Sequence, residues 1–159
     1  MKRVLQFVAI SLFAVVSASA VRAQSNPLTG TWKLNLEKSK YEPGPAPKSL
    51  TRTVDANADG AKYSFEGVTA DGKAMAYSFS VKFDGKEAPI TGSMPNGADV
   101  ISAKRTDDHH YVATIKKGGK EIGMSKVTVS ADGKTTTVDS TGTTASGTKV
   151  HEVQVFDKQ

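Results

Sequence analysis

The sequence contains, at residues 75–83, the stretch MAYSFSVKF, in which apolar side chains alternate with polar or small ones. The apolar set is Met75, Tyr77, Phe79, Val81 and Phe83. Successive side chains of a β-strand point to opposite faces, so alternation sustained over this length is typical of a strand with one buried face. We therefore predict a long strand here, with its apolar face turned toward the core.

The same period of two recurs on both sides of this stretch. Trp32, Leu34 and Leu36 alternate with polar residues, and so do Tyr63 and Phe65. After residue 23 we find no apolar stripe with the 3.6-residue period of a helix. Further strands are predicted at residues 100–105, 110–116, 122–130, 134–140 and 150–156.

Four Asp-Gly pairs and one Gly-Gly pair punctuate the predicted strands. These dipeptides favour the positive φ angles of tight hairpin turns, so each is predicted to join two neighbouring antiparallel strands. The pairs are Asp59-Gly60, Asp71-Gly72, Asp84-Gly85, Gly118-Gly119 and Asp132-Gly133.

Two irregular segments interrupt this pattern, and neither is long enough to divide the chain into two domains. Residues 41–47 contain three prolines and are predicted to cross the surface as an extended loop, and residues 91–97 form a second irregular turn. The remainder predicts an all-β fold in one domain, residues 24–159. We expect a single antiparallel up-and-down β-barrel of about 8–10 strands, with a β-sandwich as the alternative.

The first predicted strand of this domain opens with Gly30-Thr31-Trp32-Lys33-Leu34. A Gly-x-Trp at this place, followed by a meander of hairpins, resembles the calycin superfamily, which includes lipocalins and fatty-acid-binding-protein-like barrels. In those families the Trp closes one end of the barrel around a cavity for a small apolar ligand. The resemblance implies a bacterial lipocalin-like domain in which Gly30 and Trp32 have structural roles.

The sequence also departs from these families. Fatty-acid-binding proteins insert two helices between their first two strands, where this chain has its proline-rich segment. Lipocalins usually place a basic residue over the Trp, but the predicted last strand, 150–156, contains no Arg. The same strand has no match for the C-terminal Arg and Tyr that bind a fatty-acid carboxylate. The resemblance therefore implies a barrel more directly than it implies a ligand.

Residues 1–23 have the organisation of a secretory signal peptide. Lys2 and Arg3 precede an apolar core at residues 4–16 and a series of small residues, so cleavage is expected after Ala23, or alternatively after Ala20. The apolar core is shorter than the roughly 20 residues that span a bilayer. The chain has no cysteine, which excludes a lipid-bearing cleavage site and any disulfide. We expect a periplasmic or secreted product with no transmembrane segment in the mature chain.

The net charge of +5 does not indicate a nucleic-acid partner once it is divided by region. Lys2, Arg3 and Arg22 belong to the predicted signal peptide, which has no acid, so 18 bases face 16 acids from Gln24 onward. A net charge of +2 over the predicted domain is no electrostatic footprint for polyanions.

The aromatic stripe supplies the candidate ligand-binding residues. In a barrel it would line an apolar cavity together with side chains from two other predicted strands. A filled core is an equal alternative, because small barrels pack side chains inside as readily as ligands. Arg52 or Arg105 would pair with a ligand carboxylate if it faced inward. The candidates are Trp32, Tyr63, Phe65, Met75, Tyr77, Phe79, Val81 and Phe83.

No motif for catalysis or metal binding stands out. His109 and His110 are adjacent, so on a strand they point to opposite faces, and His151 is far along the chain. We interpret residues 106–110, with their two aspartates, as a polar hairpin. The sequence has no Gly-x-Ser-x-Gly elbow, and a phosphate-binding glycine loop would need a helix that is not predicted. We predict no catalytic residue, no metal, no cofactor and no enzyme activity.

Three functional hypotheses follow from the sequence. The first is an exported lipocalin-like protein that binds or carries a small apolar or amphipathic ligand. The alternative is a packed β-barrel or sandwich that acts as an envelope protein-interaction module, without ligand or catalysis. The third is a hydrolase with an unrecognised site.

Overall fold

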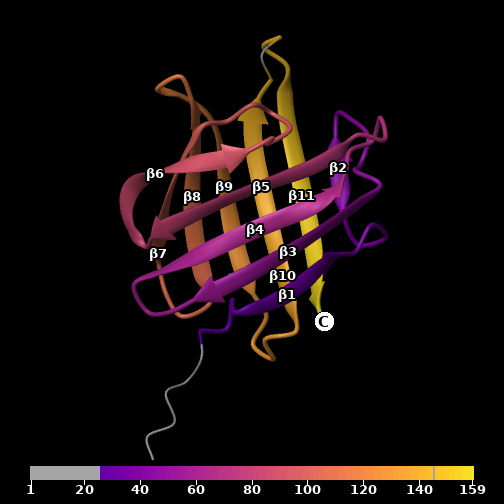
Figure 1. Ribbon diagram of the computed structural model, residues 1–159. Coiled ribbons are helices and arrows are strands. Elements are labelled where there is room, and N and C mark those ends of the chain that lie inside the picture. The colour runs from indigo at the N-terminus through magenta and orange to yellow at the C-terminus, as the bar shows by residue number, and fades with distance from the viewer. Residues whose placement is uncertain (1–25, 145) are drawn as a thin grey trace, which may run out of the picture.

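The computed structural model describes residues 26–144 and 146–159, so the predicted signal peptide, residues 1–23, lies outside the described residues. Within the described part, no helix is long and apolar enough to cross a membrane. The described residues form eleven strands (Figure 1). Their bounds are β1 (Gly30–Leu34), β2 (Lys40–Glu42), β3 (Ser49–Ala56), β4 (Gly60–Val68), β5 (Ala74–Lys82), β6 (Asp84–Gly92), β7 (Val100–Arg105), β8 (His110–Lys117), β9 (Lys120–Val129), β10 (Thr135–Thr143) and β11 (Lys149–Lys158).

Ten of these strands close into one antiparallel barrel. From β3 to β11 each strand pairs with the next in the sequence, and β1 pairs with both β3 and β11. The strand β2 lies on β11 beyond the end of β1, with Tyr41 opposite Glu152. Figure 1 shows β3, β4 and β5 crossing in front of β8 to β11, so the barrel has two layers with crossed strand directions. The predicted up-and-down barrel is confirmed, and its continuous pairing distinguishes it from a sandwich.

Four of the five predicted Gly-Gly and Asp-Gly pairs lie at turns between neighbouring antiparallel strands, whereas Asp84-Gly85 is not a hairpin turn but the start of β6, where Asp84 pairs with Lys104 of β7. The tightest is the hairpin between β8 and β9, where Lys117 pairs with Lys120 across a two-residue loop. Gly118 and Gly119 have φ angles of 56° and 79°. Positive φ at both loop residues matches the right-handed twist of the paired strands, and glycine adopts it without a steric penalty.

Two predictions near the N-terminal end of the barrel are wrong in detail. The first strand ends at Leu34, and Leu36 is 44% exposed in the following turn, where the Asn35 side chain accepts a hydrogen bond from the Lys38 N–H. The proline-rich segment is not a loop throughout, because Lys40–Glu42 forms β2 on the edge of β11. Its prolines begin at residue 43, after this short strand has ended.

Alternation predicts no bounds for β3 and β6, and it places Phe83 inside a strand that ends at Lys82. Arg52 interrupts the inward apolar series of β3. The strand β6 has few apolar residues. Its first part pairs with β7, and only its last three residues pair with β5. Phe83 lies in the turn and packs its ring on Tyr111, with 4.9 Å between ring centroids.

One end of the barrel is closed by a dense apolar cluster. Trp32 is fully buried at its centre, and the indole N–H donates a 2.9 Å hydrogen bond to the Leu28 carbonyl. Phe156, Val129 and Tyr111 reach the same cluster from three other segments. The role that the Gly-x-Trp resemblance implies for Trp32, closure of one end, agrees with this position.

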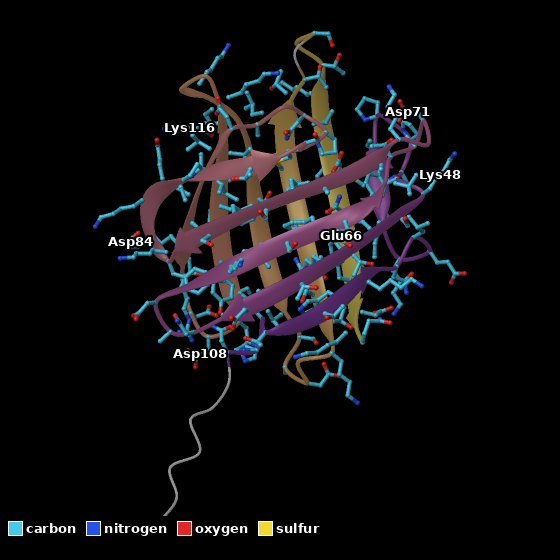
Figure 2. The ribbon with its side chains drawn as sticks, viewed as in Figure 1. Lys48, Glu66, Asp71, Asp84, Asp108 and Lys116 are labelled. Carbon is cyan, nitrogen blue, oxygen red and sulfur yellow. The ribbon has the colours of Figure 1, made fainter. Side chains whose placement is uncertain are left out.

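The charged side chains labelled in Figure 2 lie on the outside of the barrel. Glu66 is on the outer face of β4, while Lys48 and Asp71 lie near one end, and Asp84, Asp108 and Lys116 lie near strand ends. In β4 and β5 the polar phase of the alternation therefore faces outward, and the apolar phase packs in the two core clusters.

The stripe on β5 gives a direct test of this face assignment. Phe79 is 9% exposed, with its ring centroid 4.9 Å from that of Tyr63 and 5.8 Å from that of Phe65. We expect Phe79→Ala to lower the free energy of unfolding by about 3–5 kcal/mol, because it removes a buried ring and leaves a cavity. Ser78→Ala, on the opposite face, should be nearly neutral. Equal effects of the two variants in chemical denaturation would contradict the face assignment.

Candidate ligand-binding site in the barrel interior

Ten strands surround the barrel interior, and alternate residues of each strand face it. An eight-stranded barrel is just wide enough for its side chains to fill, and the diameter grows with strand number. Four inward positions of β9 and β10 carry only small residues, which reduces the filling further. These are Gly123, Ser125, Ser140 and Gly142, and they pair across the two strands.

Aromatic side chains from β4 and β5 form one wall of this interior. The ring centroids of Phe65 and Tyr77 are 4.5 Å apart, with 11° between the ring planes, and Tyr63 stacks on Phe65 at 6.2 Å. Tyr63, Phe65 and Tyr77 face inward from the middle of their strands but keep partial exposure. Their accessible surface therefore faces the interior of the barrel.

The other predicted site residues take two kinds of position. Four are buried in the apolar clusters against which Tyr63, Phe65 and Tyr77 pack, namely Trp32, Met75, Phe79 and Val81. Phe83 lies in the turn after β5, outside the strand. The predicted site residues are therefore in contact as one group. Within it, Tyr63, Phe65 and Tyr77 keep accessible surface toward the interior.

Arg52 is the cation of this interior. It projects inward from β3, where it pairs with Trp32 on one side and Phe65 on the other. Its guanidinium carbon lies 4.3 Å from the ring centroid of Phe156 and 5.4 Å from that of Trp32. The residue is only 3% exposed, and its buried Nε and Nη2 have no hydrogen-bond acceptor among the described residues.

No carboxylate of the described residues forms an ion pair with Arg52. Burial lowers its pKa to about 10, which still leaves the guanidinium charged at neutral pH. Burial also raises the pKa of Tyr63 to about 12, and the nearby Arg52 charge opposes this shift. A charged guanidinium thus lies among aromatic rings without a counter-ion.

A second cation covers Trp32 from the end of β11. Lys158 Nζ lies 5.1 Å from the Trp32 ring centroid, within the range of a cation–π interaction. Gly30 has a φ of 143°, which favours glycine, and a Cβ there would lie 2.6 Å from Cε of the flexible Lys158 side chain, which would have to move. A basic side chain therefore lies over Trp32, and it comes from a residue two positions beyond the predicted last strand.

Arg105 does not share the environment of Arg52. At the end of β7 its Nη2 donates to the Asp108 carboxylate at 2.6 Å, and its Nε donates to the Asp107 carbonyl. Both acceptors belong to the turn between β7 and β8. Of the two arginines considered from the sequence, Arg52 is the one that faces the interior without a partner.

A row of polar side chains crosses the opposite wall. Ser125 on β9 pairs in register with Ser140 on β10, Ser140 with Glu152 on β11, and Glu152 with Tyr41 on β2. The two serine hydroxyls are 2.8 Å apart and share a hydrogen bond. The Tyr41 hydroxyl is buried without a partner among the described residues. We call these four residues the polar row.

The electrostatic effects connect this row with the aromatic wall. Burial raises the pKa of Glu152, and burial together with the Glu152 charge raises the pKa of Tyr41 to about 12. Burial also raises the pKa of Tyr77, to which Glu152 adds and which Arg52 opposes. The pKa of Tyr77 therefore responds both to the Arg52 charge near the closed end and to the Glu152 charge on the other wall.

Sequence reasoning misses the polar row because the alternation of β11 suggests the wrong phase. Val153 and Val155 favour an inward face on hydrophobicity, but the side chains that share the face of the buried Phe156 are Glu152 and Gln154. The available signal was Phe156 itself: counting back from it in steps of two reaches the acid and the amide.

His109 and His110 lie at the turn between β7 and β8, whereas His151 lies within β11, paired with Thr141 and Glu42. His110 bonds to Asp107 at 2.8 Å in the turn between β7 and β8, and His151 bonds to Asp139 at 3.0 Å across β10 and β11. Among the described residues, no three acidic or histidine side chains gather as a metal site. The interpretation of residues 106–110 as a polar hairpin is confirmed.

Comparisons with known proteins concern the fold. The chain is similar to the crystal structure of zebrafish ileal bile acid-binding protein complexed with cholic acid, with a TM-score of 0.50 and 14% identity. The match covers 84% of this chain and 99% of that chain. Together with the closed antiparallel meander, this likeness defines a calycin-like barrel, as the sequence predicts.

Two redesigned β-barrels, mFAP1 and mFAP0, both bound to DFHBI, are more distantly similar. Each is 16% identical over 83% of this chain, with TM-scores of 0.43 and 0.39, and the matches cover 95% and 99% of those chains. No protein-family model matches the sequence, and no curated protein matches it.

The raised pKa of Glu152 predicts a pH-dependent gain from Glu152→Gln. Because the folded pKa lies above the unfolded value of about 4.5, the native state binds the proton more tightly, and this stabilisation is lost as pH rises through the folded pKa. Glutamine does not ionise, so the variant should melt at a higher temperature than the wild type at neutral pH.

The difference should vanish when the pH falls below about 4, where the carboxyl is protonated in both states. Thermal melts of both proteins across this range measure it. Glu66→Gln, on the outer face of β4, is the matched exposed control. A destabilised Glu152→Gln at neutral pH would mean that the carboxylate makes favourable contacts that outweigh its desolvation.

Proposed function

We propose that the barrel binds a small amphipathic acid, with the anionic group of the ligand at Arg52. The observation that carries this proposal is the buried guanidinium with two unpartnered N–H groups and no ion pair. Desolvation of an unpaired ion costs several kcal/mol in a protein, so a fold retains one where a partner arrives from outside. A carboxylate supplies that partner, because its two oxygens match the donors of a guanidinium.

The aromatic wall supports an apolar body for the same ligand. Tyr63, Phe65 and Tyr77 present ring surface to the interior, close to the Arg52 charge. Binding sites for small molecules commonly combine such apolar lining with a few convergent polar groups. The zebrafish protein of similar fold is complexed with cholic acid, which is itself an amphipathic acid.

The alternative of a packed interaction module has less support. Such a module would work through a continuous exposed apolar patch. The exposed large hydrophobic side chains of the described residues are Leu36 and Met124, which lie on segments that do not pair with each other. We therefore propose binding, without catalysis, as the function.

Arg52→Met tests the proposal, because it removes the charge and keeps much of the side-chain volume. We expect hexadecanoic acid to bind the wild type and to bind this variant at least about tenfold more weakly, the loss of a hydrogen bond to a charged group. The free variant should be as stable as the wild type or more so, since an apolar residue replaces an unpaired buried ion. Emission of Trp32, the one tryptophan, follows binding, and thermal melts follow stability.

Lys158→Met is the matched control, because Lys158 also lies over Trp32 but belongs to the exposed end of β11. It should leave the affinity for the acid nearly unchanged. The methyl ester of the same acid should bind the wild type and Arg52→Met equally. The proposal fails if the ester binds the wild type as tightly as the acid, or if Lys158→Met is the variant that loses binding.

We also propose that the protein acts outside the cytoplasm, in the periplasm or the medium, on the basis of the signal-peptide pattern of residues 1–23. The intact mass of the protein isolated from its native cells should correspond to a chain that starts at Gln24, or at Val21 after the alternative cleavage. Fractionation should recover that species outside the cytoplasm. A full-length mass that begins at Met1 would reject export by cleavage.

A further inference from the structure

The two opposite walls of the barrel interior differ in polarity: one is apolar and the other is polar. The aromatic wall of Tyr63, Phe65 and Tyr77 comes from β4 and β5, whereas the polar row of Ser125, Ser140, Glu152 and Tyr41 comes from β9, β10, β11 and β2. Figure 1 shows these two groups of strands in the two crossed layers of the barrel. An acid held at Arg52 would lie between two walls of different chemistry.

Register fixes the polar row, so it does not depend on the rotamer of any one side chain. Its members occupy directly opposed positions on four neighbouring strands, which are spaced about 4.8 Å apart, so the row extends over roughly 14 Å. A plain hydrocarbon chain would leave this length of polar surface without hydrogen-bond partners.

The hydrogen-bond inventory of the row is incomplete. Ser125 and Ser140 bond each other, and Gln154 donates a long 3.4 Å bond to Glu152. The Tyr41 hydroxyl is buried with no partner, and no basic side chain of the described residues forms an ion pair with Glu152. The row therefore has spare acceptor capacity at Glu152 and, on the neighbouring strand, a buried Tyr41 hydroxyl that makes no well-formed hydrogen bond although the Gln154 side chain lies near it.

We infer that the ligand carries hydroxyl groups along one side of its apolar body, in addition to its acid group. This inference rests on the proposed function and narrows it to facially amphipathic acids. A hydroxyl donates to Glu152 and accepts from Tyr41, which a carbonyl or an ether oxygen cannot do. The opposite side of such a ligand is apolar and packs on the aromatic wall.

The test compares octadecanoic acid with a series of its monohydroxy analogues, which differ only in the position of one hydroxyl. Each acid is titrated into the wild-type protein, and binding is followed by Trp32 emission and confirmed by native mass spectrometry. We expect at least one analogue to bind about tenfold more tightly than octadecanoic acid, which corresponds to one or two net hydrogen bonds.

Variants then assign this preference to the polar row. Ser125→Ala/Ser140→Ala and Glu152→Met should each bring the hydroxylated and plain acids to nearly equal affinity. The matched control is Ser64→Ala/Ser78→Ala, which removes a register-paired pair of serines from the outward phase of β4 and β5 and should keep the preference. Circular dichroism verifies that each variant is folded. If a variant does not fold, the titrations of the wild-type protein with the acid series still test the inference.

The outcomes distinguish a failure of the hydroxyl preference from a failure of acid binding itself. If octadecanoic acid binds but every hydroxylated analogue binds equally or more weakly, the inference is overturned and the proposed function stands. If the preference exists but persists in the interior variants, its assignment to the polar row is wrong. If no acid of the series binds, the proposed function fails as well.

Discussion

The contact between the Arg52 guanidinium and the rings of Trp32 and Phe156 unites the structure. These residues belong to β3, β1 and β11, the strands at the closure of the barrel, and the cation lies within 5.4 Å of both ring centroids. Aromatic faces attract a buried cation, which offsets part of its desolvation. The two rings belong to the apolar cluster that closes this end of the barrel, and the guanidinium against them keeps Nε and Nη2 without a hydrogen-bond partner among the described residues.

The rest of the interior follows from how a closed sheet distributes side chains. Every strand contributes alternate residues inward, so the interior is as varied as the strands that surround it. Here β4 and β5 contribute rings, while β9 to β11 contribute serine, glutamate and glutamine. The small residues of β9 and β10 matter as much as the polar ones, because they limit how far that wall fills the space. The interior is therefore asymmetric in both shape and polarity.

The strands and turns could be predicted from the sequence because short-range patterns, alternation and turn residues, determine them. The alternation at residues 75–83 predicts β5 within one residue, and Gly118-Gly119 marks a hairpin that the structure confirms. The aromatic group was also predictable, because its members lie on strands with regular alternation. What failed depended on tertiary pairing: β2 is a strand only because β11 offers it an edge.

The polar part of the candidate site shows the same limit. The inward orientation of Arg52 depends on the phase of β3, where Leu50 and Val54 provide a weak signal. For Glu152 the neighbouring valines suggest the opposite phase, and only the burial of Phe156 resolves it. Hydrophobicity predicts phase reliably where a wall is apolar, and it misleads where a wall is polar on the inside.

Closure by β1 and β11 has a further consequence, for the kinetics of folding. Trp32 pairs with Lys158, so the contacts that complete the barrel join the two ends of the described chain. Hairpins between sequence neighbours form early, whereas such distant contacts carry a large loop-closure entropy and slow the final step. A partly folded chain would therefore have its hairpins formed, but the cluster around Trp32 and Phe156 that closes one end of the barrel would still be missing. The interior comes into existence only when the first and last strands meet.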